Sequence, residues 1–193
     1  MKKTLASLAI AIGLANAAQA APVQWTVASG GNDHWYEFVA TNLIAQDAFV
    51  AAGAATYMGM SGYLATVTSV NENRFVSATV AHGALAWLGG SDSGSEGNWV
   101  WMVGPEAGQA FSFAAWGGGE PNDFSGGEDF IHTNHCGNGC WNDHGGPGGG
   151  SSQANGYIIE YGDSLSTVPE PMTLALVLPA LLAAAALGRR RTG

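Results

Sequence analysis

Five oxygen-bearing side chains are grouped in three short segments of the second half of the chain. Glu120-Pro-Asn is followed eight residues later by Glu128-Asp, and then by an Asn-Asp pair at 142–143. Calcium takes about six to eight oxygen ligands, which carboxylate and amide side chains supply. A backbone carbonyl from Asp143 would bring the protein ligands to six, and the remaining positions suit a vicinal pair of sugar hydroxyls. The sequence therefore predicts a calcium site formed by Glu120, Asn122, Glu128, Asn142 and Asp143.

All five residues lie in a glycine-rich stretch. Twelve glycines occur among the 35 residues from Trp116 to Gly150, and a loop of this composition is entropically costly to order. A bound ion would hold such a loop in place. Pro121 adds a local constraint, because a cis bond before proline costs little and would turn Glu120 and Asn122 toward the same ion.

Two helices are expected to precede this loop. Apolar residues at helical spacing predict a first helix over 41–52, and the small residues of 53–62 predict a loop after it. Ser69-Val-Asn-Glu72 is a capping box, in which the serine caps the helix and the glutamate reaches back. A second helix is expected from this box to about His82, ended by Gly83.

Short strands account for most of the remaining chain. Trp87, Trp99 and Trp101 are expected in the core, because they alternate as strand residues do. Runs rich in aromatic and β-branched residues predict strands over 24–27, 34–39, 63–68, 86–89, 98–102, 128–132 and 157–161. The predicted fold class is α+β, with two helices against small antiparallel sheets and a long calcium-binding loop.

Charge excludes one class of partner. Arg74 is the only basic residue between Asp33 and Asp163, while fourteen of the fifteen acids fall there, which gives this part a net charge of about −13. A surface with one arginine cannot neutralise phosphates, so nucleic acid is excluded as a partner. The same negative field attracts cations, and hard cations prefer oxygen ligands.

Both ends of the chain are predicted to be targeting segments. Residues 1–20 have the basic start, apolar run and Ala-x-Ala end of a secretory signal peptide, so the mature chain is expected to begin at Ala21. Residues 164–193 hold a Val-Pro-Glu-Pro segment, a short uncharged stretch and three terminal arginines. As a helix this stretch would be about 24 Å long, short for a hydrocarbon core of about 30 Å. The folded domain is expected to span 21–163.

This tail resembles the PEP-CTERM sorting signal of Gram-negative bacteria. The resemblance implies export, transient membrane anchoring through the tail, and cleavage by an exosortase-type protease, often in species that make extracellular polysaccharide. The mature domain would then lie at the cell surface or in the extracellular space. A plain C-terminal anchor is the alternative.

The domain itself resembles the C-type lectin-like family over nearly its whole length. The resemblance rests on motifs in a fixed order: GYLATVTS at 62–69, WLGG at 87–90, WVW at 99–101, EPN at 120–122, ED at 128–129, WND at 141–143 and YIIE at 157–160. In the family, the Glu-Pro-Asn form goes with mannose-type sugars. By matching position, the five predicted calcium ligands would also bind the sugar, and Asp123 and Asp129 match two ligands of a second calcium site.

The cysteines depart from the two disulfides that the family often has. Cys136 and Cys140 are the only two cysteines, and in an oxidising compartment we expect them to pair with each other. Nitrogen and sulfur ligands also suit zinc, so a zinc site is an alternative, formed by His132, His135, Cys136, Cys140 and His144.

No catalytic motif accompanies these residues. The chain has no Gly-x-Ser-x-Gly elbow, phosphate loop or His-Glu-x-x-His pair, so it is predicted not to be an enzyme. The predicted function is calcium-dependent binding of a glycan or extracellular polysaccharide of mannose type, outside the cell. The alternative is a calcium-stabilised adhesion or structural module of the extracellular matrix that binds no sugar.

Overall fold

A computed structural model describes residues 21–145 and 154–162 of the protein. The predicted signal peptide at 1–20 and the predicted tail at 164–193 lie outside the described residues. Within the described ranges, no helix has the length and apolar character needed to cross a bilayer.

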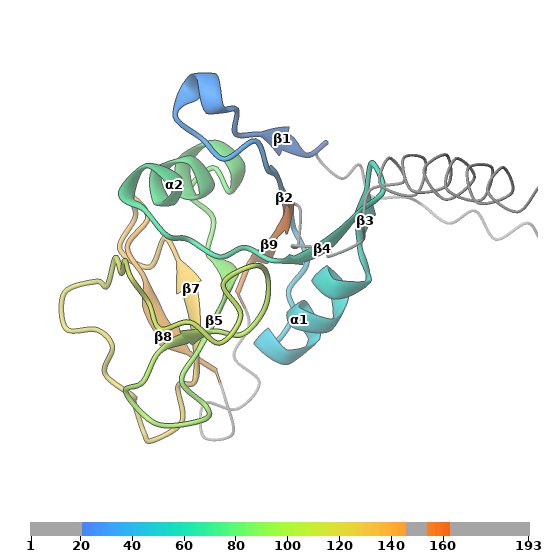
Figure 1. Ribbon diagram of the computed structural model, residues 1–193. Helices are drawn as coiled ribbons and strands as arrows, with labels where there is room; N and C mark the ends of the chain where they lie inside the picture. The colour runs from blue at the N-terminus through green and yellow to red at the C-terminus, as the bar shows by residue number, and fades with distance from the viewer. Residues whose placement is uncertain (1–20, 146–153, 163–193) are drawn as a thin grey trace, which may run out of the picture. The chain divides into compact units, whose positions relative to one another are not determined.

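A sheet of nine strands forms the centre of the domain (Figure 1). The main path runs β1-β2-β9-β5-β7-β8, with β4 also pairing with β9, β3 with β4 and β6 with β5. Every pairing is antiparallel except that of β5 with β9. The strand bounds are β1 Val23–Gln24, β2 Trp35–Val39, β3 Thr56–Tyr57, β4 Met60–Leu64, β5 Ala86–Ser91, β6 Val100–Trp101, β7 Phe130–Thr133, β8 Asn142–His144 and β9 Gly156–Tyr161.

Strand β9 is buried along its whole length because helices cover both of its faces. Successive side chains of a strand point to opposite faces. Ile158 accordingly packs with the buried residues of the second helical segment, and Ile159 packs with α1, Ala45–Ala54. Each face therefore has its own apolar cluster, and burial of these clusters is the main stabilising term of the domain.

The second helical segment consists of α2, Val70–Arg74, followed directly by η2, Phe75–Val80, which is a π-helix. The predicted cap is confirmed, since the Ser69 hydroxyl accepts a hydrogen bond from the Glu72 amide at 3.2 Å. The Glu72 carboxylate reaches back one residue further than expected, to the amide of Thr68 at 2.7 Å. The second helical segment, which faces the disulfide loop, therefore begins at a side-chain cap.

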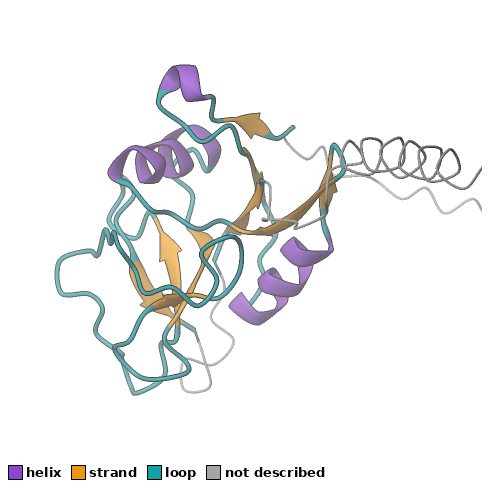
Figure 2. Ribbon diagram, viewed as in Figure 1, coloured by secondary structure: helices purple, strands orange, loops and turns teal. Residues whose placement is uncertain are grey.

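The predicted elements are present with shifted bounds. The first helix begins at Ala45 rather than 41, and residues 27–29 form a short 3₁₀ helix, η1 (Val27–Ser29), instead of continuing the first strand. The expected loop at 53–62 contains β3 and the start of β4, and β8 was not predicted. The three tryptophans expected in the core are confirmed, with Trp87 fully buried. Long loops lie beside β7 and β8, at the lower left of the view in Figure 2.

A buried polar network joins α2 to β2 and β9. The Tyr36 hydroxyl donates to Glu72 at 2.7 Å and lies 3.1 Å from Glu160, and His34 Nδ1 lies 2.6 Å from the same Glu160 carboxylate. The hydrogen bond with Glu160 raises the pKa of His34. Burial, and next the charge of Glu160, raises the pKa of Glu72. Both shifts favour the protonated forms in the folded state.

This network predicts that the contribution of His34 to the free energy of unfolding falls as the pH rises from about 6 to about 8. The folded pKa of His34 lies above its ordinary value of 6.5, so its contribution is complete below that pH and is lost as the pH rises through the folded pKa. Urea unfolding at both pH values, in EDTA, gives the slope of the free energy of unfolding against pH, to which the buried His132 contributes with the opposite sign. His34→Gln should make this slope more positive than in wild type, whereas the exposed His82→Gln should leave it unchanged. An unchanged slope in His34→Gln would contradict the assignment.

Candidate functional site

The three segments that carry the predicted ligands are held together by backbone hydrogen bonds. Trp116 and Trp141 form an isolated bridge, in which the Gly117 amide donates to the Trp141 carbonyl at 2.8 Å. The strand that carries Asn142 and Asp143 pairs with β7, which directly follows Glu128-Asp129. The fold thus brings all three segments to one end of the sheet.

Asp143 is the centre of the arrangement. Its carboxylate accepts hydrogen bonds from the backbone amides of Asn122, at 3.0 and 3.1 Å, and Asp123, at 2.7 Å. The Asn122 side chain donates to the Glu120 carboxylate, and the bond between Glu120 and Pro121 is cis, as expected. Burial, and next the neighbouring Asp143, raises the pKa of Glu120.

Glu128 closes the other side of the site. One of its carboxylate oxygens accepts from the amide of Phe124 at 3.0 Å, and the other lies 3.0 Å from His144 Nδ1. The Glu128 amide in turn donates to Asp123 at 3.2 Å. Four of the five predicted ligands are thus joined by direct contacts, or by contacts through residues 123–124.

Asn142 tests whether the site fits a cation. Its amide nitrogen donates to the carbonyl of Asp143 at 2.5 Å, while its side-chain oxygen is buried and has no hydrogen-bond partner among the described residues. A buried acceptor without a partner costs about 1–3 kcal/mol. A cation held among these oxygens would satisfy this acceptor and offset the repulsion between Glu120 and Asp143. The donor set is all oxygen, which suits calcium.

A second acidic cluster was only partly predicted. Asp92, Glu96 and Asp129 each place a carboxylate oxygen within 4.8 Å of the others. One oxygen of Asp92 accepts from the Gly97 amide at 2.8 Å, and the other is buried without a partner in the described chain. Burial raises the pKa of Asp92 and, with the charge of Asp123, that of Asp129.

Sequence reasoning found Asp129 in this cluster but missed Asp92 and Glu96. These two lie in the turn after β5, far from Asp129 in the sequence, and only the register of β5 with β7 brings them together. The signal that could have found them is the acid-rich SDSGSE turn at 91–96. Asp123, which was expected there, is not one of the three clustered side chains.

The cysteines form the predicted disulfide, with 5.8 Å between the Cα atoms of Cys136 and Cys140. The zinc alternative is wrong in its sulfur ligands, because neither cysteine is a free thiol. His132 packs edge-on against Trp87 at 5.8 Å between ring centroids, and burial lowers its pKa to about 4. His144 stacks on the same tryptophan at 6.1 Å. These rings serve as aromatic packing beside the site.

Phe124 lies at the edge of the predicted calcium site and was not singled out from the sequence. It directly follows Asp123 in the loop, and 72% of its surface is exposed. An exposed aromatic ring beside oxygen ligands provides a flat apolar surface for the C–H face of a sugar ring.

Comparison with known proteins gives matches over part of the chain. Residues 51–146 match the model of the lectin C-type domain family. The chain is 32% identical over 154 residues to halomucin of Haloquadratum walsbyi, across 73% of this chain and 2% of halomucin. It is 35% identical over 81 residues to lectin BRA-3 of Megabalanus rosa, across 42% of this chain and 47% of the lectin. The chain therefore spans less than half the length of both relatives.

The solved structures agree on the fold. The C-type lectin CEL-I from Cucumaria echinata superposes with a TM-score of 0.57 at 24% identity, over 68% of this chain and 92% of CEL-I. At this level of identity the likeness shows the fold, which is the C-type lectin fold with two helices and a mixed sheet.

Proposed function

We propose that this chain, which contains a C-type lectin-like domain, binds carbohydrate through a calcium ion held by the five predicted ligands. The observation that carries the proposal is the convergence of Glu120, Asn122, Glu128, Asn142 and Asp143, together with the unpartnered buried oxygen of Asn142. Calcium would supply direct coordination of two vicinal hydroxyls of the sugar.

The protein residues would orient that hydroxyl pair. Glu120 accepts and Asn122 donates on one side of the site, and Asp143 and Asn142 repeat this division on the other. This arrangement suits two equatorial hydroxyls, each of which both donates and accepts a hydrogen bond. We therefore propose a preference for mannose-type sugars, with Phe124 beside the ring.

The second acidic cluster is proposed to hold another calcium ion. Asp92, Glu96 and Asp129 surround a point with oxygens from two separate segments, and Asp92 has an unpartnered buried oxygen there. An ion at this point would fix the loop after β5 against β7, and calcium stoichiometry by equilibrium dialysis distinguishes one ion from two.

The proposed location is outside the cell. It rests on the signal-peptide pattern of residues 1–20 and on the tail at 164–193, which is proposed to anchor the protein transiently until an exosortase-type protease removes it. The intact mass of the cellular protein tests this proposal, and a C-terminus that still reaches Arg191 in most molecules would contradict processing.

Retention on glycan beads tests the function. The protein should bind mannose beads in millimolar calcium, elute with EDTA, and bind galactose beads less strongly. Retention on mannose that survives EDTA would contradict the calcium mechanism. Binding to no glycan, together with clear stabilisation by calcium, would favour the alternative of an adhesion or structural module that binds no sugar.

A further inference from the structure

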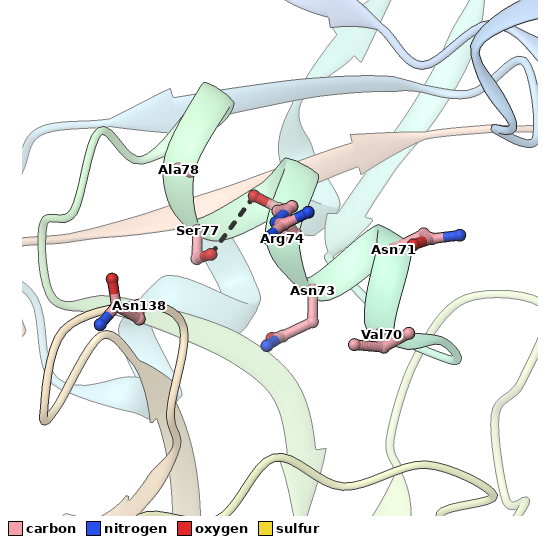
Figure 3. Close-up of a pocket in the computed structure, with 7 residues that line it drawn as sticks. All are labelled: Val70, Asn71, Asn73, Arg74, Ser77, Ala78 and Asn138. Carbon is pink, nitrogen blue, oxygen red and sulfur yellow. Dashed lines mark hydrogen bonds between the residues drawn. The ribbon is translucent and has the colours of Figure 1, made fainter.

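A polar groove runs along α2 and η2, between this helical segment and the disulfide loop. Its volume is about 410 Å³. Figure 3 shows its lining residues: Asn73 and Ser77 lie on the side of the helical segment that faces the loop with Asn138, and Arg74 and Asn71 project from the same stretch of helix. None of these residues belongs to the proposed calcium sites.

Hydrogen bonds and close packing hold the floor of the groove in place. Asn73 donates to the carbonyl of Gly139 at 2.8 Å and accepts from the Trp141 indole at 2.8 Å. Gly139 sits so close to the helix that an added Cβ would lie 2.6 Å from the Ser77 hydroxyl. The π-helical turn of η2 supplies Ser77 and Ala78 to the lining. Such turns are rare and occur frequently at functional sites.

Charge sets this groove apart from the rest of the domain. Arg74 is the only lysine or arginine between Asp33 and Asp163, it is exposed, and it forms no ion pair with any residue in 21–145 or 154–162. No carboxylate lines the groove. None lines the adjoining hollow either, where Arg74 lies with the stacked rings of Trp25 and Phe75.

We propose that this groove is a second glycan site, which binds the carboxylate of an acidic sugar without calcium. The planar guanidinium of Arg74 matches a carboxylate in two parallel hydrogen bonds. The exposed amides of Asn71 and Asn138 suit ring hydroxyls, and the half-buried ring of Phe75 beside Arg74 suits a C–H face. This site does not depend on the proposed function of the calcium loop.

Titration of the full chain with trigalacturonate in EDTA tests this proposal. We expect shifts in the NMR side-chain resonances of Arg74, Asn71 and Asn138. The fully methyl-esterified trisaccharide keeps the hydroxyls but lacks the charge, and it should bind roughly tenfold or more weakly. Arg74→Gln should lower the affinity for the acid by the same factor. Arg74→Lys should restore only part of this affinity, because lysine keeps the charge but cannot form the two parallel hydrogen bonds of the guanidinium.

Two control measurements show whether Arg74→Gln is folded and whether its calcium site is intact. Arg74→Gln should melt at the wild-type temperature, since the side chain is exposed and makes no ion pair with the described residues, and its calcium-dependent retention on mannose beads should be unchanged. Equal binding of acid and ester, equal binding by wild type and Arg74→Gln, or binding that appears only with calcium would each overturn the proposal. Failure of the wild-type protein to bind mannose beads in calcium would instead count against the calcium site.

Discussion

Calcium is expected to raise the melting temperature of this protein by roughly 10 °C. An ion that binds only the folded state adds about 2.7 kcal/mol when its concentration is a hundredfold above its dissociation constant. For a domain of this size, each kcal/mol corresponds to about 3–4 °C. The physical source is the group of carboxylates around Asp143, whose mutual repulsion the ion removes. Melting curves in EDTA and in millimolar calcium measure the effect.

The variant Asn142→Leu is expected to lose the stabilisation by calcium while it keeps the stability of the metal-free protein. In EDTA this variant should be as stable as wild type within about 1 kcal/mol, because removal of an unpartnered buried acceptor offsets the lost hydrogen bond to Asp143. In calcium it should lose most of the rise in melting temperature, since one ligand is gone.

Asn73→Leu is the matched control for this variant. It also removes a buried asparagine, but both ends of Asn73 have partners, in Gly139 and Trp141. It should therefore lower the stability in EDTA and in calcium alike, and leave the rise with calcium in place. A full calcium response in Asn142→Leu, or no response in wild type, would contradict the proposed site.

The proposed ligand set could be named from the sequence because its chemistry is local. Glu-Pro-Asn, Glu-Asp and Asn-Asp each name their ligands within three residues, and hydrogen bonds to Asp143 and Glu128 bring four of the five side chains together. The second cluster was not predictable in the same way. Asp92 and Glu96 meet Asp129 only through strand pairing, which no local pattern encodes.

The helices and strands follow the same rule: those with a local sequence signal were predicted, and those that depend on tertiary contacts were missed. Helices with a strong cap or period were found, as at Ser69, where the side chain fixes the first turn. Strand β8 was missed because Asn142-Asp143-His144 has no apolar alternation, and its pairing with β7 is what makes it a strand. The π-helical turn of η2 likewise follows from tertiary packing, since its sequence FVSATV reads as ordinary helix.

The double substitution Glu120→Gln with Asn122→Asp is expected to reverse the preference from mannose to galactose. Asn122 now donates to Glu120 across the cis bond, and the swap keeps this contact with donor and acceptor exchanged. The number of side-chain oxygens and the total charge are preserved, so the rise in melting temperature with calcium should largely remain. Only the side of the site that donates a hydrogen bond to the sugar changes.

Retention on beads that carry mannose or galactose is the proper measurement for this swap. A single sugar is expected to bind near millimolar, about −4 kcal/mol, and multivalent display amplifies the difference. Gln46→Glu with Asp47→Asn moves a charge by one position on the exposed surface of α1 and serves as the control, which should leave the mannose preference intact. If the swapped site still responds to calcium but keeps the native preference, the orientation of donors around the ion does not determine the choice of sugar.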